Sequence, residues 1–152
     1  MDNFFIFCAK YLFILSPLLV LWIFYKAPAE IRKQMFWHGL LILPISFVFG
    51  LIARKLYFDP RPFVVEYFTP LIPHVADNGF PSDHTLLLAT LASLMTIFHR
   101  ESAALLWVIT LLVGISRVYV GIHHPIDIVG SIIIALIATA LVHFVLERVK
   151  KV

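Results

Sequence analysis

The sequence of 152 residues contains little cysteine, little charge and none of the glycine-rich loops that bind nucleotides. Its single cysteine, Cys8, lies in an apolar run, which excludes an intramolecular disulfide and a cysteine metal cluster. Neither G-x-x-x-x-G-K-[ST] nor G-x-G-x-x-G occurs, so nothing indicates nucleotide binding. Only 14% of the residues are charged, and the net charge of +3 comes from short basic clusters between apolar runs. This pattern argues against a nucleic-acid partner.

Apolar residues make up 61% of the chain and fall into five segments, at about 4–25, 35–53, 83–99, 103–121 and 125–146. About 20 apolar residues are needed to cross a bilayer. We therefore predict an all-α fold in one domain over 1–152, an integral membrane helical bundle with about five transmembrane helices. The segment after Ser82 is the shortest and carries hydroxyl side chains, which favours a central helix packed among the others.

The distribution of basic residues predicts the orientation of the bundle, because cytoplasmic loops carry more Lys and Arg than outer loops. One side would hold Lys26, Arg32, Lys33, Arg100, Arg148, Lys150 and Lys151, and the other side Arg54, Lys55, Arg61 and Arg117. The first side is predicted to be cytoplasmic, so the N-terminus lies outside and the C-terminus inside. Asp2 and Asn3 stand where a signal peptide would be basic, which predicts a retained first span. The connection 54–82 is rich in proline and apolar residues, and we expect it at the outer membrane surface.

Polar residues concentrate in the stretch 116–127, which reads S-R-V-Y-V-G-I-H-H-P-I-D. A charged residue near a bilayer costs several kcal/mol unless it faces protein or water. If a helix begins near Pro125, His123 lies just before it and Asp127 in its first turn, where the carboxylate can hold an imidazole nitrogen. The stretch by itself fits a polar helix cap equally well.

Two further clusters are predicted to join this stretch at the outer ends of the helices: R-K-L-Y-F-D-P-R-P at 54–62 and P-S-D-H at 81–84. Guanidinium groups bind phosphate oxygens through forked hydrogen bonds, and a helix beginning near Ser82 would offer its N-terminal amides to an anion. Two histidines suit phosphoryl transfer, with His123 as nucleophile and His84 as general acid. The cationic residues that could hold the phosphoryl group are Arg61 and Arg117, with Arg54 or Lys55.

These clusters resemble the signature of the type 2 phosphatidic acid phosphatase superfamily, which is K-x6-R-P, then P-S-G-H, then S-R-x5-H-x3-D. The third motif fits at every specified position, and the first fits at Arg61 and Pro62. Arg54 occupies the interval of the family lysine, while Lys55 is one residue closer. Asp83 replaces the glycine of the second motif, as in the bacterial undecaprenyl-diphosphate phosphatases that include bacitracin-resistance proteins.

The resemblance implies a membrane lipid phosphatase with a catalytic core at about 54–130. His123 would form a phosphohistidine, Asp127 would orient it and His84 would protonate the leaving group, without metal or other cofactor. The residues that would bind the phosphate are Arg54, Lys55, Arg61, Ser82, Asp83 and Arg117. The expected reaction is hydrolysis of undecaprenyl diphosphate, a polyprenyl diphosphate, to undecaprenyl phosphate and inorganic phosphate on the outer face of the bacterial cell membrane. The family commonly has six spans, against the five expected here.

Several alternatives stay open at this point. The substrate could be phosphatidic acid or phosphatidylglycerophosphate, and a small membrane carrier or lipid-binding protein could use the same outer charges. A zinc site built from His84, His123, His124 and Asp127 is disfavoured because the spacing is unlike H-E-x-x-H. Asp83 could cap a helix, contact a headgroup or change local pKa values. His124 is expected to be a polar neighbour, His74 and Asp77 to be loop residues or substrate contacts, and His38, His99 and His143 to be packing residues.

Overall fold

The computed structural model describes residues 1–149, and Lys150 and Lys151 of the orientation prediction lie outside them. All regular elements of the described chain are helices, as predicted. In chain order these are α1 (Asp2–Tyr11), the 3-10 helix η1 (Leu12–Ile14), α2 (Leu15–Lys26), α3 (Ala29–Leu56), α4 (Pro62–Val65), α5 (Asp83–Phe98), α6 (Arg100–Tyr119) and α7 (Pro125–Val149).

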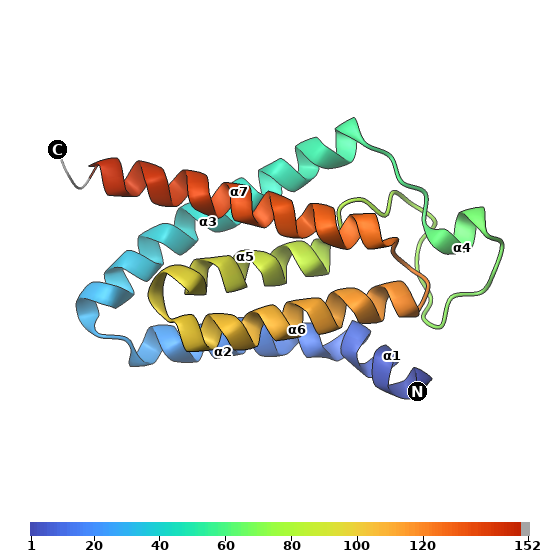
Figure 1. Cartoon of the computed structure of the whole chain (residues 1–152), viewed down its shortest axis with the longest axis horizontal. Helices are drawn as coiled ribbons and strands as arrows, with labels where there is room; N and C mark the ends of the chain where they lie inside the picture. Colours follow the sequence, from blue (N-terminus) through green and yellow to red (C-terminus); the bar gives the residue numbers. More distant parts are fainter. Residues whose placement is uncertain (150–152) are drawn as a thin grey trace.

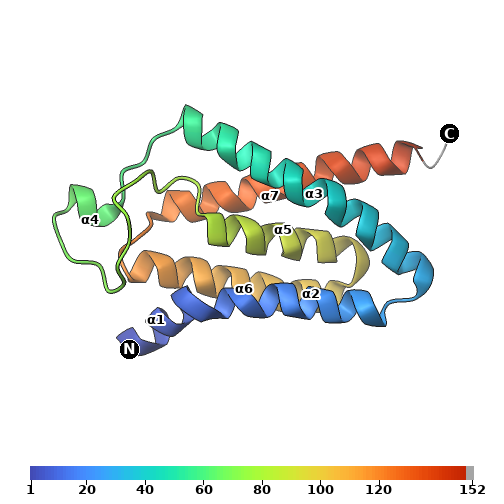
Figure 2. The same cartoon turned by 180° about the vertical axis from the view of Figure 1, so that it is seen from behind.

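The long helices form one elongated bundle in which α5 lies in the middle, with α6 and α2 on one side and α7 and α3 on the other (Figures 1 and 2). The N-terminus, α4, the loop around it and the first turns of α5 and α7 all lie at one end of this bundle. We call this end the loop end. It brings together the three motif clusters that the sequence placed on one face of the membrane.

Four segments of the described chain are long and apolar enough to span a membrane: Asp2–Lys26, Ala29–Leu56, Arg100–Tyr119 and Pro125–Val149. Helix α5 has 16 residues, so it is about 24 Å long at 1.5 Å per residue. The hydrocarbon core of a bilayer is about 30 Å thick. This short helix is the most enclosed of the bundle, since all its residues from Leu88 to Met95 are buried. The prediction of a central helix after Ser82 is confirmed.

The outer surface of the bundle is apolar along its length, which suits contact with lipid chains. Large side chains that are about half exposed or more include Phe4, Leu18, Trp22, Phe47, Val108, Ile133 and Phe144. In a soluble protein such a surface would drive aggregation. The chain is therefore a membrane protein, and its four long apolar segments are suited to crossing the bilayer.

Two helix boundaries differ from the sequence-based expectation. The first apolar run is interrupted by η1, where the backbone at Tyr11 leaves helical geometry with φ −124°. Helix α3 begins at Ala29, six residues before the predicted start, because the polar segment 30–34 contains strong helix formers directly after Pro28. Pro44 lies inside α3 without ending it, which membrane helices tolerate.

Candidate active site

The turn between α6 and α7 positions the central histidine. Gly121 adopts φ +83°, a left-handed conformation that a side chain would strain, and its N–H donates to Val118 O at 3.0 Å. The next N–H, from Ile122, donates to Arg117 O at 3.2 Å. This tight turn carries the chain from the last turn of α6 to His123, two residues before α7 begins at Pro125. The helix start predicted near Pro125 is confirmed.

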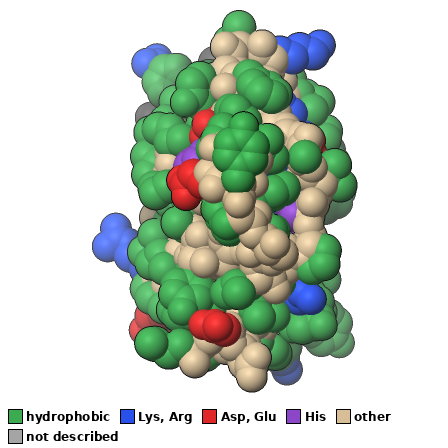
Figure 3. All heavy atoms as spheres, turned by 90° about the vertical axis from the view of Figure 1, so that its right-hand side faces the viewer, with side chains coloured by type: hydrophobic (Ala, Val, Ile, Leu, Met, Phe, Trp, Pro, Cys, Tyr) green, Lys and Arg blue, Asp and Glu red, His purple; other side chains and the backbone are tan. Residues whose placement is uncertain are grey.

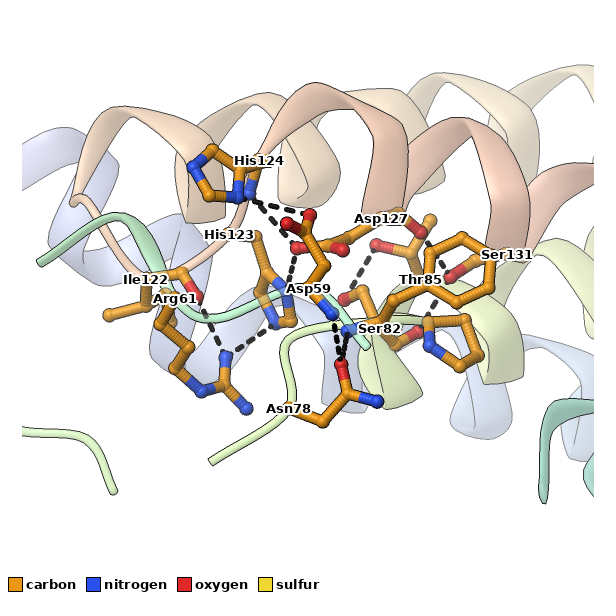
Figure 4. Close-up of polar contacts among 12 residues, drawn as sticks. Asp59, Arg61, Asn78, Ser82, Thr85, Ile122, His123, His124, Asp127 and Ser131 are labelled. Atoms are coloured by element: carbon orange, nitrogen blue, oxygen red, sulfur yellow. Dashed lines mark hydrogen bonds and ion pairs between the residues drawn. The ribbon is translucent and has the colours of Figure 1, made fainter. Parts of the chain in front are cut away.

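His123 and Asp127 form a buried pair (Figure 4). His123 Nδ1 lies 2.9 Å from Asp127 Oδ2, and the backbone N–H of His124 donates to the same oxygen at 2.9 Å. The carboxylate is fully buried and His123 is 2% exposed. With Nδ1–H donating to the carboxylate, Nε2 keeps its lone pair for chemistry. The contact expected from the spacing of four residues is present.

The surroundings of His123 favour the neutral imidazole. Burial lowers the pKa of His123 well below its ordinary value, and the positive charges of Arg117 and Arg61 lower it further. A protonated ring would place a third cation in a small buried space. His123 therefore combines a fixed tautomer with the unprotonated state that a nucleophile needs.

Two buried arginines lie beside His123. Arg61 Nη1 is 3.3 Å from His123 Nε2 and donates to Ile122 O at 2.7 Å, while Arg61 Nε donates to Asp77 Oδ1 at 2.6 Å. Arg117 Nη1 donates to Ala9 O at 3.2 Å, and Arg117 Nε is buried without a hydrogen-bond partner in the described chain. Two largely desolvated guanidinium groups at one imidazole form an environment that favours a phosphoryl anion.

The start of α5 lies against the start of α7. Ser82 is the N-cap residue of α5, and its hydroxyl accepts a hydrogen bond from Thr85 Oγ1 at 3.2 Å. Ser131 Oγ donates to Ser82 O at 3.0 Å, which links the two helices. His84 lies in the first turn of α5, where it is half-buried, and its ring packs edge-on against Phe13 with centroids 4.6 Å apart. Burial lowers the pKa of His84 to about 4, and the neighbouring Arg117 and His123 contribute, so the protonated form of His84 needs the negative charge of a bound phosphate.

Arg54 and Asp83 form an ion pair at the edge of the site. Arg54 Nη2 donates to Asp83 Oδ1 at 2.6 Å and to Pro81 O at 3.4 Å. Lys55 is exposed, and no polar contact of its side chain occurs in the described chain. Of the two residues that could take the place of the family lysine, Arg54 is therefore the one directed towards α5. Asp83 is tied to this cation, while the N-cap position belongs to Ser82.

Four residues that the motifs did not single out lie around the central pair. His124 Nδ1 lies 3.0 Å from Asp59 Oδ2, and Asn78 holds the Asp59 segment through its side-chain amide. Gly79 packs so closely that a Cβ on it would lie 2.9 Å from Asp127 Oδ2. The Asn78-Gly79 dipeptide, a common turn signal, was the one hint in the sequence.

Asp59, His124 and Asp127 are also the one group in residues 1–149 that could offer three ligand atoms to a metal ion, all within 4.8 Å of one another. This set differs from the zinc set considered from the sequence, which contained His84 and His123 without Asp59. In the structure His124 bonds to both Asp59 and Asp127, and Asp127 bonds to His123, so hydrogen bonding accounts for their proximity.

The remaining histidines separate into two groups. His74 lies in the loop above the site, with its ring centroid 6.4 Å from that of His123. At the opposite end of the bundle, His38 Nε2 lies 3.3 Å from His143 Nδ1, and the His38 ring packs against Phe98. His99 caps α6 by accepting from Ser102 N.

Figure 3, which looks onto the loop end, shows acidic and histidine side chains surrounded by apolar ones.

Comparison with known proteins connects this geometry to one family. The sequence profile of the PAP2 superfamily matches residues 35–150. The chain is 34% identical to undecaprenyl-diphosphatase BcrC of Bacillus subtilis over 90% of its own length and 70% of that protein. It is 33% identical to the putative undecaprenyl-diphosphatase YbjG of Escherichia coli, over 87% of this chain and 67% of the relative.

Similarity extends to a third relative and to a solved structure. Phosphatidylglycerophosphatase B of Bacillus subtilis is 31% identical over 76% of this chain and 61% of its own length. The crystal structure of Aquifex aeolicus LpxE superposes with a TM-score of 0.74 at 25% identity, covering 93% of this chain and 84% of the other.

Proposed function

Because the chain belongs to the PAP2 superfamily of membrane phosphatases, we propose that it hydrolyses undecaprenyl diphosphate through a phosphohistidine on His123. The observation that carries the proposal is the position of His123, whose Nδ1 is held by Asp127 and whose Nε2 lies beside Arg61. The resemblance of the three sequence motifs to the superfamily signature supports the same assignment.

In the proposed first step, His123 Nε2 attacks the terminal phosphorus. The P–N bond forms as the P–O bond to the lipid phosphate breaks, and His84 gives a proton to the departing oxygen. Arg61 and Arg117 stabilise the charge on the transferred phosphoryl group, and Asp127 stabilises the imidazolium that forms. In the second step water attacks the same phosphorus and gives a proton to His84, the P–N bond to His123 breaks, and inorganic phosphate leaves. The residues of the chain itself supply each proton and charge, so we propose that catalysis is independent of metal.

Two features support a long-chain diphosphate as substrate. Next to Asp83, an apolar hollow on the bundle surface continues between α2, α3 and α5, lined by Leu21, Phe24, Leu40, Leu43, Leu87 and Leu91. Its larger part measures about 500 Å³, which suits part of an isoprenoid chain. Above the phosphoryl site, His74 offers a further polar group for the second phosphate of a diphosphate.

The active site is proposed to face the outside of the cell membrane. The loop end carries Arg54, Lys55, Arg61 and Arg117. The other end of the described chain carries five basic residues, namely Lys26, Arg32, Lys33, Arg100 and Arg148. The excess of basic residues in cytoplasmic loops then assigns the loop end to the outer surface.

The test is phosphate release by the purified protein in detergent, given undecaprenyl diphosphate, phosphatidylglycerophosphate or phosphatidic acid, with and without EDTA. We expect the diphosphate to give the highest kcat/KM, unchanged by EDTA. His123→Ala should lose about 1,000-fold or more while remaining folded, because the nucleophile is removed. Preference for phosphatidylglycerophosphate would select the second candidate, which the similarity to phosphatidylglycerophosphatase B favours. No release from any of the three would support a carrier or a lipid-binding protein.

A further inference from the structure

We propose that Asp59 is a positioning residue, which acts through His124 to hold Asp127 and thereby the reactive tautomer of His123. The proposal rests on the proposed function, since it assigns a role to Asp59 in that same site. Asp59 stands at an unspecified position of the first motif, between Arg54 and Arg61. Its contacts, however, connect it to the buried centre of the site (Figure 4).

The first step is the double connection of His124. Its backbone N–H donates to Asp127 Oδ2, and its imidazole Nδ1 lies 3.0 Å from Asp59 Oδ2. The Asp127 oxygen that accepts from this N–H is the one bonded to His123 Nδ1. Displacement of the His124 ring would therefore move the peptide group that orients Asp127. Asp59 holds that ring in place. It therefore acts on the orientation of His123 through His124 and the Asp127 carboxylate.

The second step is the way the loop presents Asp59. The Asn78 side chain makes four hydrogen bonds: Oδ1 accepts from the N–H groups of Asp59 and Phe80, and Nδ2 donates to Arg54 O and Tyr57 O. Gly79 N–H then donates to Asp59 O at 2.8 Å. These bonds attach the end of α3 to the segment before α5. Such a fully bonded amide holds two irregular segments in one geometry.

The third step is electrostatic. Burial and the neighbouring charge of Asp127 raise the pKa of Asp59, and the contact with His124 opposes this rise. Oxygen atoms of the Asp59 and Asp127 carboxylates lie within 4.8 Å of each other. Two carboxylates at this distance repel one another unless hydrogen-bond donors stabilise their charges. His124 contacts both of them: its ring Nδ1 lies 3.0 Å from Asp59 Oδ2, and its backbone N–H donates to Asp127 Oδ2. The His124 donors therefore stabilise both acidic residues, and Asp127 remains an acceptor for His123.

The test uses Asp59→Asn and His124→Gln, with Glu66→Gln as the matched control. Glu66 is an exposed carboxylate of the same loop and lies outside the network. The first readout is the His123 tautomer, followed by ¹⁵N NMR of histidine-labelled protein, which needs no turnover. We expect one Nδ1–H tautomer in the wild type and the control, and a mixture of tautomers in both test variants.

The second readout is kinetic, on the lipid phosphate that the wild type hydrolyses fastest. Each test variant should lower kcat by about 10-fold or more, the loss typical when a group that orients a functional side chain is removed. KM should change little, and the double variant should lose no more than the worse single variant, because both act through one contact.

An unchanged tautomer and kcat in Asp59→Asn would overturn the proposal, as would losses that multiply in the double variant. If Asp59→Asn fails to fold, the same two measurements on His124→Gln decide the proposal. This variant removes the ring that contacts Asp59 and keeps the backbone N–H that contacts Asp127. Absence of phosphate release by the wild type would contradict the proposed function alone, because the tautomer measurement still decides the role of Asp59.

Discussion

Gly79 shows at the scale of one residue how little free space surrounds the central carboxylate. A Cβ at this position would lie 2.9 Å from Asp127 Oδ2 and 3.3 Å from Asp59 O, closer than ordinary contacts allow. We predict that Gly79→Ala displaces Asp127 and lowers kcat by about 10-fold or more, since small misplacements of catalytic groups have large effects. Phosphate release measures the effect.

Gly39→Ala is the matched control, because its new methyl group would meet its nearest atom, in Leu94, at 3.7 Å. This variant should keep wild-type activity. Equal activities of the two alanine variants would show that the site tolerates a shift of Asp127.

The charge state of His123 gives a second prediction for a single residue. A lowered pKa means that the ring loses its proton at a lower pH, so on acidification His123 remains neutral below the ordinary value of 6.5. We expect its ¹⁵N ring signals to stay constant from pH 8 to about pH 6. A titration midpoint at or above 6.5 would contradict the neutral-nucleophile assignment.

His74 is predicted to distinguish diphosphates from monophosphates. Its half-buried ring lies beside that of His123, where it could bond to the phosphate that is not transferred. His74→Asn should lower kcat/KM for a prenyl diphosphate by about 10-fold, equivalent to about 1.4 kcal/mol, and change the value for the monophosphate much less. Val75→Ala, at an exposed neighbouring residue, serves as the control. Equal losses on both substrates would place His74 at the transferred phosphoryl group instead.

Residues related by helix geometry were predictable from the sequence, and residues joined through irregular loops were not. The contact between His123 and Asp127 follows from a helix that begins at Pro125. The contacts of Asp59 with His124 and of Asn78 with Tyr57 join segments 65 and 21 residues apart. No periodic pattern encodes such pairs, because the connection 57–82 is mostly without regular structure.

At the scale of elements, the first helix is part of the active-site framework. Ala9 is fully buried against Ile72, Val120 and Ile122, and its carbonyl accepts from Arg117. Ala9→Leu would overpack this contact at a cost of about 1–3 kcal/mol and shift Arg117. We predict a lower thermal midpoint together with lower phosphate release.

Phe7→Leu changes an exposed side chain of the same helix and should leave both quantities near wild type. Unchanged activity in Ala9→Leu would show that α1 contributes only to the lipid-facing surface.

Element boundaries show the limits of hydropathy as a predictor. The apolar pattern located all five long segments but missed the break at η1 and the early start of α3. The break follows Lys10 and lies three residues before Pro17, which has no N–H to donate to Phe13 O, so its signal in the sequence is a proline and not a change in hydropathy. The early start involves charged residues such as Glu30 and Arg32, which continue a helix beyond the apolar region through their helix propensity alone.

At the scale of the whole molecule, orientation can be measured with single cysteines. The native Cys8 is buried, and replacing it by alanine removes any background reaction. We predict that a membrane-impermeant thiol reagent labels Glu66→Cys in intact cells, and labels Glu101→Cys only after lysis. These positions lie in the loop around α4 and at the start of α6, at opposite ends of the bundle. The reverse pattern would place the site in the cytoplasm.

The contact between Arg117 and Ala9, together with the pair formed by His123 and Asp127, has a consequence for biogenesis. Helix α1 is synthesised before α7, yet both contribute atoms to the proposed catalytic centre. During synthesis the helices α1, α2, α3, α5 and α6 therefore leave the ribosome before Asp127, the residue that holds His123. A nascent chain that stalls before α7 would have no carboxylate to hold His123, so the proposed phosphatase activity would require the synthesis of α7.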